Sequence, residues 1–434
     1  MKRILIVSYY WPPSGGAGVQ RWVKLSKYFS KHGVIPYVVT VDPEKASYAL
    51  RDETLCDEVD ASIKVFHTCT LEPYGIYKTL TRKKEIPFGG FSNDEKHKLK
   101  FSQKFSRFIR GNMFLPDARV GWNRFAFKKC CEIIERENID AIITTSPPHS
   151  TQLVGLKLKK KYNLPWLADL RDPWTGIYYY EKLLLTKFSK RRDAKMELKV
   201  LESADGIVVV SNDIRQNLIS KSKNLQTEKF HVIPNGFDQD DFDKVSAEEK
   251  TKDFVISYTG TLTVDYRLEG FLSAIKIIIA ENKSIRFQIT GSMPHTIKEK
   301  IENIAGEKVI FKSHVSHHEA IAQMKSADLL LLVIPDAKGN KGILTGKLFE
   351  YLSSEKPILC IGPENGDAAK IISDCSAGKS FLYEDADGIR SFIESNFEDW
   401  KTTGKTKGGE TSIIKKFSRE NQAEEMLEII NRIK

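Results

Sequence analysis

Short apolar runs alternate along this chain with segments in which apolar residues recur every three or four positions. Residues 4–7 form a β-branched run that ends in Pro and Gly, and Val19, Trp22 and Phe29 then recur at helical spacing. Residues 37–41 form a second β-branched run. The N-terminal segment therefore predicts strand, glycine loop, helix and strand, which together make a βαβ unit of a parallel sheet.

The same alternation continues to the end of the chain, with one interruption and one restart. Further buried strands are expected at residues 141–145, 166–169 and 206–210 and, after Asn235-Gly236, at residues 254–258, 285–290, 309–311, 329–333 and 357–360. The stretch from about 74 to 123 breaks the rhythm and is expected to be an insertion of helices and loops. Residues 237–252 are charged and lack apolar periodicity, so we expect a domain boundary there.

These patterns predict an α/β fold of two doubly wound, Rossmann-like parallel-sheet domains, over residues 1–240 and 241–412. An amphipathic helix is expected at about 412–432. A length of 434 residues suits two domains of about 200 residues each. Open α/β sheets bind ligands beyond the carboxyl ends of their strands, so functional residues are expected on the loops that follow strands, facing a central cleft.

The net charge of +10 is unevenly distributed. Residues 1–240 carry 40 Lys and Arg against 27 Asp and Glu, and residues 241–434 carry 27 against 30, so the halves are +13 and −3. Residues 78–110 hold ten basic and three acidic residues interleaved with Phe. Such a stretch fits an anionic membrane surface, a nucleic acid, or a solvated helical face with no partner.

The cysteines and the apolar runs bear on the compartment. The six cysteines form no CxxC pair and no metal-ligand spacing with histidine, which fits a reduced, cytoplasmic chain. The apolar run 4–11 follows Lys2-Arg3 but continues into Pro-Pro-Ser-Gly-Gly, unlike a signal peptide. No run reaches the roughly 18 to 20 apolar residues of a membrane span. Any membrane contact is expected to be peripheral.

Residues 344–360 join a small loop, a charged helix start and a buried strand. Thr345 and Gly346 leave backbone N–H groups at a helix N-terminus, where phosphate is favoured, and Lys347 adds a full charge. Glu350 follows Lys347 by three residues, so both side chains can point the same way. A carboxylate there could accept both hydroxyls of a ribose. The alternative is a solvated Lys-Glu pair on an ordinary helix.

Loops after strands of the first domain carry further candidates. Gly15 and Gly16 permit close backbone approach to donor phosphates or acceptor, although the loop does not match G-x-G-x-x-G, which disfavours a nicotinamide-dependent oxidoreductase. Another such loop contains His149. Charged candidates for ligand binding follow the next strand and are Asp169, Arg171 and Asp172. Three such charges cannot all be buried unpaired, so they pair internally or reach a ligand.

In the second domain, a loop with Gly260 and Thr261 can approach phosphate through its backbone, and Arg267 can clamp a diphosphate. The alternative for Arg267 is an exposed surface arginine. Gly291 ends another strand and is a candidate neighbour of a nucleotide base. Asp238-Gln239-Asp240 has the form of a D-x-D metal motif but lies in the expected linker, so no catalytic metal is predicted.

Five segments together resemble the family 4-like glycosyltransferases of the GT-B fold. They are residues 11–21, 168–174, 231–238, 258–262 and 344–360, in the family's order and spacing. The resemblance implies a nucleotide-sugar donor, with Glu350 on the ribose, Lys347 and Arg267 on the diphosphate, and His149 at the sugar and reaction centre. It also implies a C-terminal helix, residues 413–434, that crosses back to the first domain.

The chain departs from the family pattern at one position. The first of the family's two usual glutamates falls on Gly342, so only backbone N–H groups of residues 340–344 can contact a sugar or phosphate there. The resemblance implies retaining, metal-independent transfer of a sugar to a glycan or lipid-linked acceptor in cell-surface polysaccharide synthesis, with no cofactor besides the donor. The alternatives are a nucleotide-sugar epimerase of the same shape and a noncatalytic nucleic-acid binder. The Thr-Gly-Lys-x-x-Glu segment argues against the latter.

Overall fold

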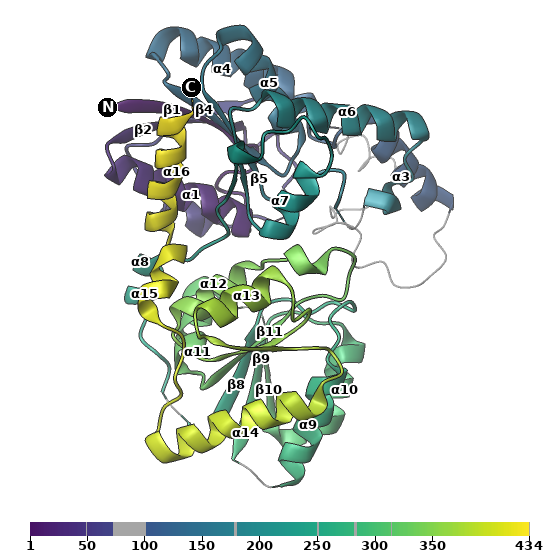
Figure 1. The fold of residues 1–434 in the computed structure, drawn as a ribbon, viewed down its shortest axis with the longest axis vertical. Coiled ribbons are helices and arrows are strands. Elements are labelled where there is room, and N and C mark those ends of the chain that lie inside the picture. Colours follow the sequence, from purple (N-terminus) through teal and green to yellow (C-terminus); the bar gives the residue numbers. More distant parts are fainter. Residues whose placement is uncertain are drawn as a thin grey trace. The chain divides into compact units, whose positions relative to one another are not determined.

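The computed structural model describes residues 1–48, 50–72, 101–177, 180–249, 251–281, 284–313 and 315–433. The chain forms two compact units (Figure 1): unit 1 is Met1–Pro234 with Arg419–Lys434, and unit 2 is Asn235–Ser418. Most of the basic stretch 78–110, and much of the expected insertion 74–123, lies outside the described residues.

Unit 1 is built on a seven-stranded parallel sheet in the order β3-β2-β1-β4-β5-β6-β7. Its strands are β1 (Lys2–Val7), β2 (Val34–Val41), β3 (Lys64–Thr68), β4 (Ala141–Ser146), β5 (Trp166–Leu170), β6 (Gly206–Val209) and β7 (Phe230–Val232). Its helices are α1 (Ala17–Lys31), α3 (Phe101–Met113), α4 (Asn123–Glu137), α5 (Ser150–Tyr162), α6 (Lys187–Ser203), α7 (Asn212–Ile219) and α16 (Arg419–Arg432), with 3₁₀ turns η1 (Glu53–Cys56), η2 (Val120–Trp122), η3 (Tyr180–Leu183) and η4 (Thr227–Lys229).

The apolar run in β1 explains why this sheet is covered on both faces. Leu5 and Val7 belong to one buried cluster with residues of α4, α5, α6 and α7. Ile4 and Ile6 point to the other face and join a cluster with α1 and α16. Because successive strand residues face opposite ways, a continuous apolar run requires helices on both sides.

Unit 2 repeats this architecture with a six-stranded parallel sheet in the order β10-β9-β8-β11-β12-β13. Its strands are β8 (Phe254–Thr259), β9 (Ile285–Thr290), β10 (Val309–Lys312), β11 (Leu329–Val333), β12 (Ile358–Ile361) and β13 (Gly378–Phe381). Its helices are α8 (Gln239–Asp243), α9 (Glu269–Ala280), α10 (His295–Ala305), α11 (His317–Ser326), α12 (Gly346–Ser353), α13 (Asp367–Asp374), α14 (Ala386–Thr403) and α15 (Thr411–Ile414), with 3₁₀ turns η5 (Gly306–Lys308), η6 (Asn340–Gly342) and η7 (Lys415–Phe417).

The predicted fold class of two parallel sheets with interleaved helices is confirmed, and each strand named from the sequence is present. Three strands were not predicted, namely β3, β7 and β13. These strands are short and only partly apolar, so periodicity does not mark them. The prediction of one continuous helix at 412–432 is wrong, because Ser418 is extended with ψ 148° and separates η7 from α16.

Among the described helices, none is both long enough and apolar enough to cross a bilayer.

Gly155→Ala in α5 should destabilise unit 1, although Gly to Ala inside a helix ordinarily stabilises by about 0.5–1 kcal/mol. A Cβ at this position would lie 2.4 Å from the indole of Trp166, which donates from Nε1 to Thr144 Oγ1 at 2.8 Å and is therefore held in place. We expect a loss of about 1–3 kcal/mol by denaturant unfolding. In a Trp166→Phe background the same change should cost less. An equal cost in both backgrounds would contradict the steric explanation.

Candidate functional site

The N-terminus of α12 brings together three predicted site residues, Thr345, Gly346 and Lys347. Thr345 is its N-cap residue, yet the Thr345 side chain makes no capping hydrogen bond, and its buried Oγ1 has no partner in the described structure. Gly346 begins the helix. The first N–H groups of a helix carry partial positive charge and need acceptors. An anion with oxygen acceptors fits both requirements.

Lys347 brings a full positive charge to the same helix end. Its Nζ lies 2.6 Å from the Tyr258 hydroxyl and 4.3 Å from the centre of the Tyr258 ring. Burial lowers the pKa of Lys347 to about 8, although the Glu350 carboxylate acts in the opposite direction. A cation at a helix N-terminus is unfavourable by itself, so this arrangement favours a negatively charged ligand.

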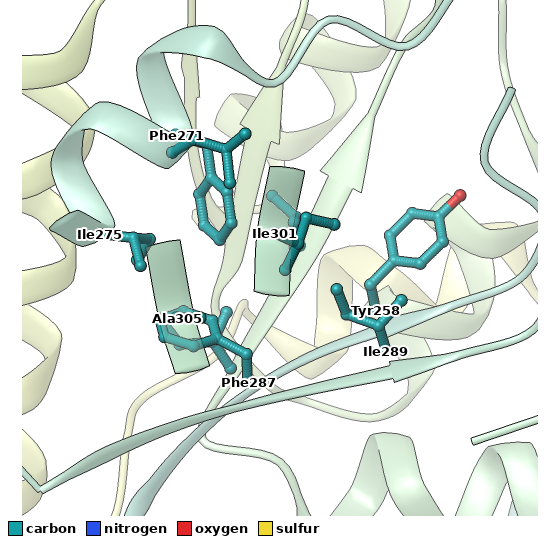
Figure 2. Close-up of a pocket in the computed structure, with 10 residues that line it drawn as sticks. Tyr258, Phe271, Ile275, Phe287, Ile289, Ile301 and Ala305 are labelled. Atoms are coloured by element: carbon teal, nitrogen blue, oxygen red, sulfur yellow. The ribbon is translucent and has the colours of Figure 1, made fainter. Parts of the chain in front are cut away.

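Tyr258 connects this cation to the core of unit 2. Its ring lines a small apolar cavity, and Figure 2 shows its hydroxyl directed away from the apolar side chains Phe271, Phe287 and Ile301. The ten lining residues, Tyr258 included, come from β8, β9, β11, α9 and α10. The lining offers no charge and no acid–base group, so this cavity is a packing defect of the core and not the ligand site.

Two glycines shape the loops after β8 and β9. Gly260 and Gly291 have φ values of +121° and +126°. A Cβ on Gly291 would lie 2.2 Å from the Gly260 carbonyl oxygen, and a Cβ on Gly260 would lie 3.0 Å from Lys347 Nζ. Only glycine allows both the conformation and the close approach. Thr261 extends the loop, and its Oγ1 lies 3.1 Å from Ser292 Oγ.

Glu350 lies one turn after Lys347, and its Oε1 is 2.9 Å from Nε2 of His317 at the start of α11. His317 was not predicted as a site residue. The capping box formed by Ser316 and Glu319 marks the start of this helix and was available in the sequence. The contact between His317 and Glu350 could not be predicted from the sequence, because only tertiary folding brings together two residues that lie 33 positions apart.

Tyr351 is a second residue that sequence reasoning missed. It is fully buried, and its hydroxyl accepts from the Thr259 backbone N–H at 3.1 Å. This bond ties α12 to the end of β8. The residue after Glu350 therefore fixes the helix relative to the glycine loop.

Arg267 lies among three carboxylates in the structure. Its guanidinium is 3.2 Å from Asp336 and 3.6 Å from Glu269, and it also pairs with Glu384. These contacts raise its pKa further and hold it in a surface network. A phosphate would have to compete with these carboxylates.

Gly342 lies in the turn η6, where its N–H donates to Gly339 O at 3.3 Å and the Ile343 N–H donates to Asn340 O at 3.1 Å. These two N–H groups already have acceptors. A contact between the turn and a sugar would therefore involve other groups or a rearranged turn.

In unit 1, Asp169 at the end of β5 is fully buried. Its carboxylate accepts from Trp22 Nε1 at 2.9 Å and Thr145 Oγ1 at 2.7 Å and lies 3.3 Å from Arg21. Arg21 also donates to the Pro234 carbonyl at 2.6 Å. Of the two options left open by the sequence, internal pairing describes Asp169. Its contacts position α1 and the ends of β4 and β5.

Arg171 lies nearer the glycine loop. Its Nε donates to Ser146 O at 3.0 Å, and a Cβ on Gly18 would lie 2.0 Å from its Nη1, so the guanidinium rests against the first turn of α1. Gly16 is the N-cap residue of α1 with φ +107°, and the Gly15 N–H donates to Leu50 O at 3.0 Å. Burial raises the pKa of Asp172, opposed by Arg171.

His149 is buried between the end of β4 and α5, with its ring stacked on Trp174 at a centroid distance of 5.1 Å. Trp174 Nε1 donates to Asp193 at 2.8 Å, which fixes the indole. Burial lowers the pKa of His149 to about 3, helped by Lys221 and Arg171. Its buried Nδ1 has no hydrogen-bond partner in the described structure, so this neutral imidazole keeps one unsatisfied polar atom.

No group of three His, Cys, Asp or Glu side chains suited to a metal ion occurs among the residues that the structure describes. Asp238 of the D-x-D segment caps α8, where its side chain accepts from Asp240 N at 3.3 Å. All six cysteines are free thiols.

Comparisons with known proteins agree with the fold. Residues 89–241 match the model of Glycosyltransferase Family 4. A glycosyltransferase from Rickettsia africae is similar with a TM-score of 0.62 and 16% identity, covering 99% of this chain and 98% of that one. Anabaena Alr3699/HepE in complex with UDP-glucose has a TM-score of 0.61 and 14% identity, with both chains fully covered. The lipopolysaccharide outer core galactosyltransferase WaaB is similar with a TM-score of 0.53 and 13% identity, and the match covers 99% of each chain. No curated protein matches by sequence.

His149 should remain neutral across the physiological range, because its pKa of about 3 leaves it protonated only in strong acid. The measurement is an NMR titration of the protein labelled with ¹³C at histidine Cε1. The His149 resonance is identified by its disappearance in His149→Gln, and it should not shift between about pH 5 and about pH 8. A titration midpoint inside that range would contradict the burial of this ring.

Proposed function

We propose that this family 4-like glycosyltransferase of the GT-B fold binds a nucleoside diphosphate sugar on unit 2 and transfers the sugar, with retention and without a metal ion, to a hydroxyl of a glycan or lipid-linked acceptor. The observation that carries the proposal is the positively charged, incompletely capped start of α12, where Lys347 and the unpartnered Thr345 hydroxyl lie together.

The diphosphate is the ligand part that suits this helix end. Its oxygens can accept from the first N–H groups of α12 and from Thr345, and its charge offsets that of Lys347. The glycine loop at Gly260 and Thr261 adds backbone that approaches closely, since Gly260 carries no Cβ against Lys347. Arg267 is assigned to the same diphosphate. To bind it, the guanidinium must exchange part of its contacts with Asp336, Glu269 and Glu384 for phosphate oxygens.

The ribose is assigned to Glu350. Its carboxylate is acceptor-only when ionised and can take two hydroxyl donors, as the two ribose hydroxyls require. The hydrogen bond from His317 holds one oxygen in a fixed direction, which leaves the other oxygen to the ligand. Gly291 lies beside Gly260 at the end of β9 and is assigned to the base.

In unit 1, His149, Arg171 and Asp172 are assigned to sugar and acceptor, with Gly15 and Gly16 providing the loop. A histidine with a pKa of about 3 is not protonated at neutral pH and cannot serve as a general acid, so His149 acts as a neutral hydrogen-bonding group. In the proposed front-face reaction, the bond from the anomeric carbon to the diphosphate oxygen breaks, the acceptor oxygen bonds to that carbon, and the departing phosphate takes the acceptor proton. Stabilising that phosphate is then the main task of the protein.

The relatives narrow the donor class. Alr3699/HepE was solved with UDP-glucose, and TarM with UDP, so a UDP-hexose is the first donor to test. WaaB acts on lipopolysaccharide outer core, which supports a role in cell-surface polysaccharide synthesis. The free cysteines fit a reducing compartment such as the cytoplasm.

Glu350→Ala should weaken donor binding at least about tenfold, because losing a charge-assisted hydrogen bond costs about 1.5–3 kcal/mol. The measurement is the rise in Tm on adding UDP-, GDP-, ADP- or CMP-sugars, a rise that follows binding by mass action. Glu398→Ala, an exposed position on α14, is the matched control and should retain the full shift. A donor shift unchanged in Glu350→Ala would remove Glu350 from the site. If the protein converts the donor to an epimer in the absence of any acceptor, its function is epimerisation and not sugar transfer.

Donor affinity should fall as pH rises through about 8, the pKa of Lys347, since the charged ammonium that attracts phosphate exists only below it. If binding depends wholly on this charge, the loss is about tenfold per pH unit above the pKa. Lys347→Met should bind weakly at every pH. The test is to measure donor affinity by calorimetry for the unmodified chain and for Lys347→Met at each pH, and to take the ratio of the two affinities. Ionisation of the ligand affects both affinities equally and cancels in the ratio. A ratio constant from about pH 7 to about pH 10 would exclude Lys347 as the titrating cation.

A further inference from the structure

Exposed apolar side chains gather where α3 meets the chain that leads into α6. Ten large apolar residues are exposed in the described part of the chain, and four of them lie here: Phe108 at 44%, Met113 at 72%, Leu184 at 42% and Phe188 at 73%. Scattered exposed apolar residues are ordinary, but a concentration of large ones marks an interaction surface.

The two segments that carry these residues are held together. Asn112 Nδ2 donates to Leu184 O at 3.2 Å, and Asn112 Oδ1 accepts from Thr186 N at 2.8 Å. Gly111 allows the approach, since a Cβ there would lie 2.5 Å from Leu183 O. Figure 1 shows α3 beside this segment within unit 1. Leu184 has a φ of +52°, which is unusual for a leucine.

Basic residues predominate on this surface. Residues 101–113 contain three basic residues and residues 182–192 contain five, eight in all, and neither segment contains an acidic residue. The basic residues are Lys104, Arg107, Arg110, Lys182, Lys187, Lys190, Arg191 and Arg192. All of them except Arg107 and Arg110 are exposed, and those two are partly exposed.

We propose that this surface, residues 101–113 with 182–192, docks unit 1 on an anionic lipid bilayer. Phe108, Met113, Leu184 and Phe188 enter the interface between headgroups and acyl chains, and the basic residues contact lipid phosphates. Large apolar side chains among basic ones match a bilayer surface, which offers both an apolar interior and negative charge. A nucleic acid offers the charge without the apolar layer. The inference uses no residue of the donor site and does not depend on the transfer reaction.

The test is co-sedimentation of the full chain with vesicles of phosphatidylcholine containing phosphatidylglycerol, and with phosphatidylcholine alone. We expect binding to the anionic vesicles and little to the neutral ones. Two variants, Phe108→Ser/Phe188→Ser and Lys187→Glu/Arg191→Glu/Arg192→Glu, should each reduce vesicle binding about tenfold or more. The first removes two apolar side chains that enter the bilayer interface. The second removes three basic groups, each of which strengthens binding roughly fivefold near the lipid.

The matched charge control is Lys128→Glu/Lys157→Glu/Lys160→Glu on α4 and α5, which changes net charge equally at exposed positions elsewhere on unit 1. It should retain most of the binding. The apolar control is Ile277→Ser on α9 of unit 2. Circular dichroism and the donor-induced rise in Tm should be unchanged in every variant, which separates a lost surface from a lost fold.

Several outcomes would overturn the proposal. One is equal loss of binding in the charge control, which would indicate attraction by net charge alone. Another is full binding by Phe108→Ser/Phe188→Ser, which would exclude apolar insertion. Salt-sensitive binding to single-stranded or duplex nucleic acid, with no binding to vesicles, would assign the surface to that partner instead.

Discussion

The ammonium group of Lys347 is the constraint on which the organisation of the candidate donor site depends. It is a half-buried cation at the positive end of a helix, where both desolvation and the helix dipole oppose the charge, and desolvation lowers its pKa to about 8. The Tyr258 hydroxyl and ring and the Glu350 carboxylate compensate in part. The remaining imbalance is what a diphosphate can neutralise. Gly260 belongs to the same arrangement, because any side chain there would contact the ammonium.

Unit 1 handles buried charge in a different way. Asp169 and Arg21 are both fully buried, and they are compensated by each other, by Trp22 and Thr145, and by the Pro234 carbonyl. Removing one partner of such a pair leaves the other uncompensated, so the network fixes the geometry of the strand ends. His149 is neutral in this environment, and its ring direction is set by Trp174 and, through it, by Asp193.

The uneven charge of the chain has separate physical uses in the two units. In unit 2, charges of the two signs are nearly balanced, and cations such as Arg267 and Arg390 have carboxylate partners. In unit 1, a basic excess is concentrated in two segments that contain no acidic residue and that expose large apolar side chains. Ion pairs within a unit fix its geometry, whereas a surface rich in basic and apolar side chains favours an extended anionic partner.

The sequence by itself determined the fold class and the start of α12. Continuous apolar runs such as residues 4–7 fit a sheet that is covered on both faces. Thr345 stands just before a segment with helical apolar spacing, which is a helix-start signal. Tertiary structure decided the partners. It joined His317 to Glu350, Tyr258 to Lys347 and Tyr351 to Thr259, enclosed Asp169 completely, and placed Arg267 among carboxylates. It also brought α3 against residues 183–186. Local periodicity reports which face of an element is buried, but contacts between distant positions depend on how the elements pack, which no local pattern encodes.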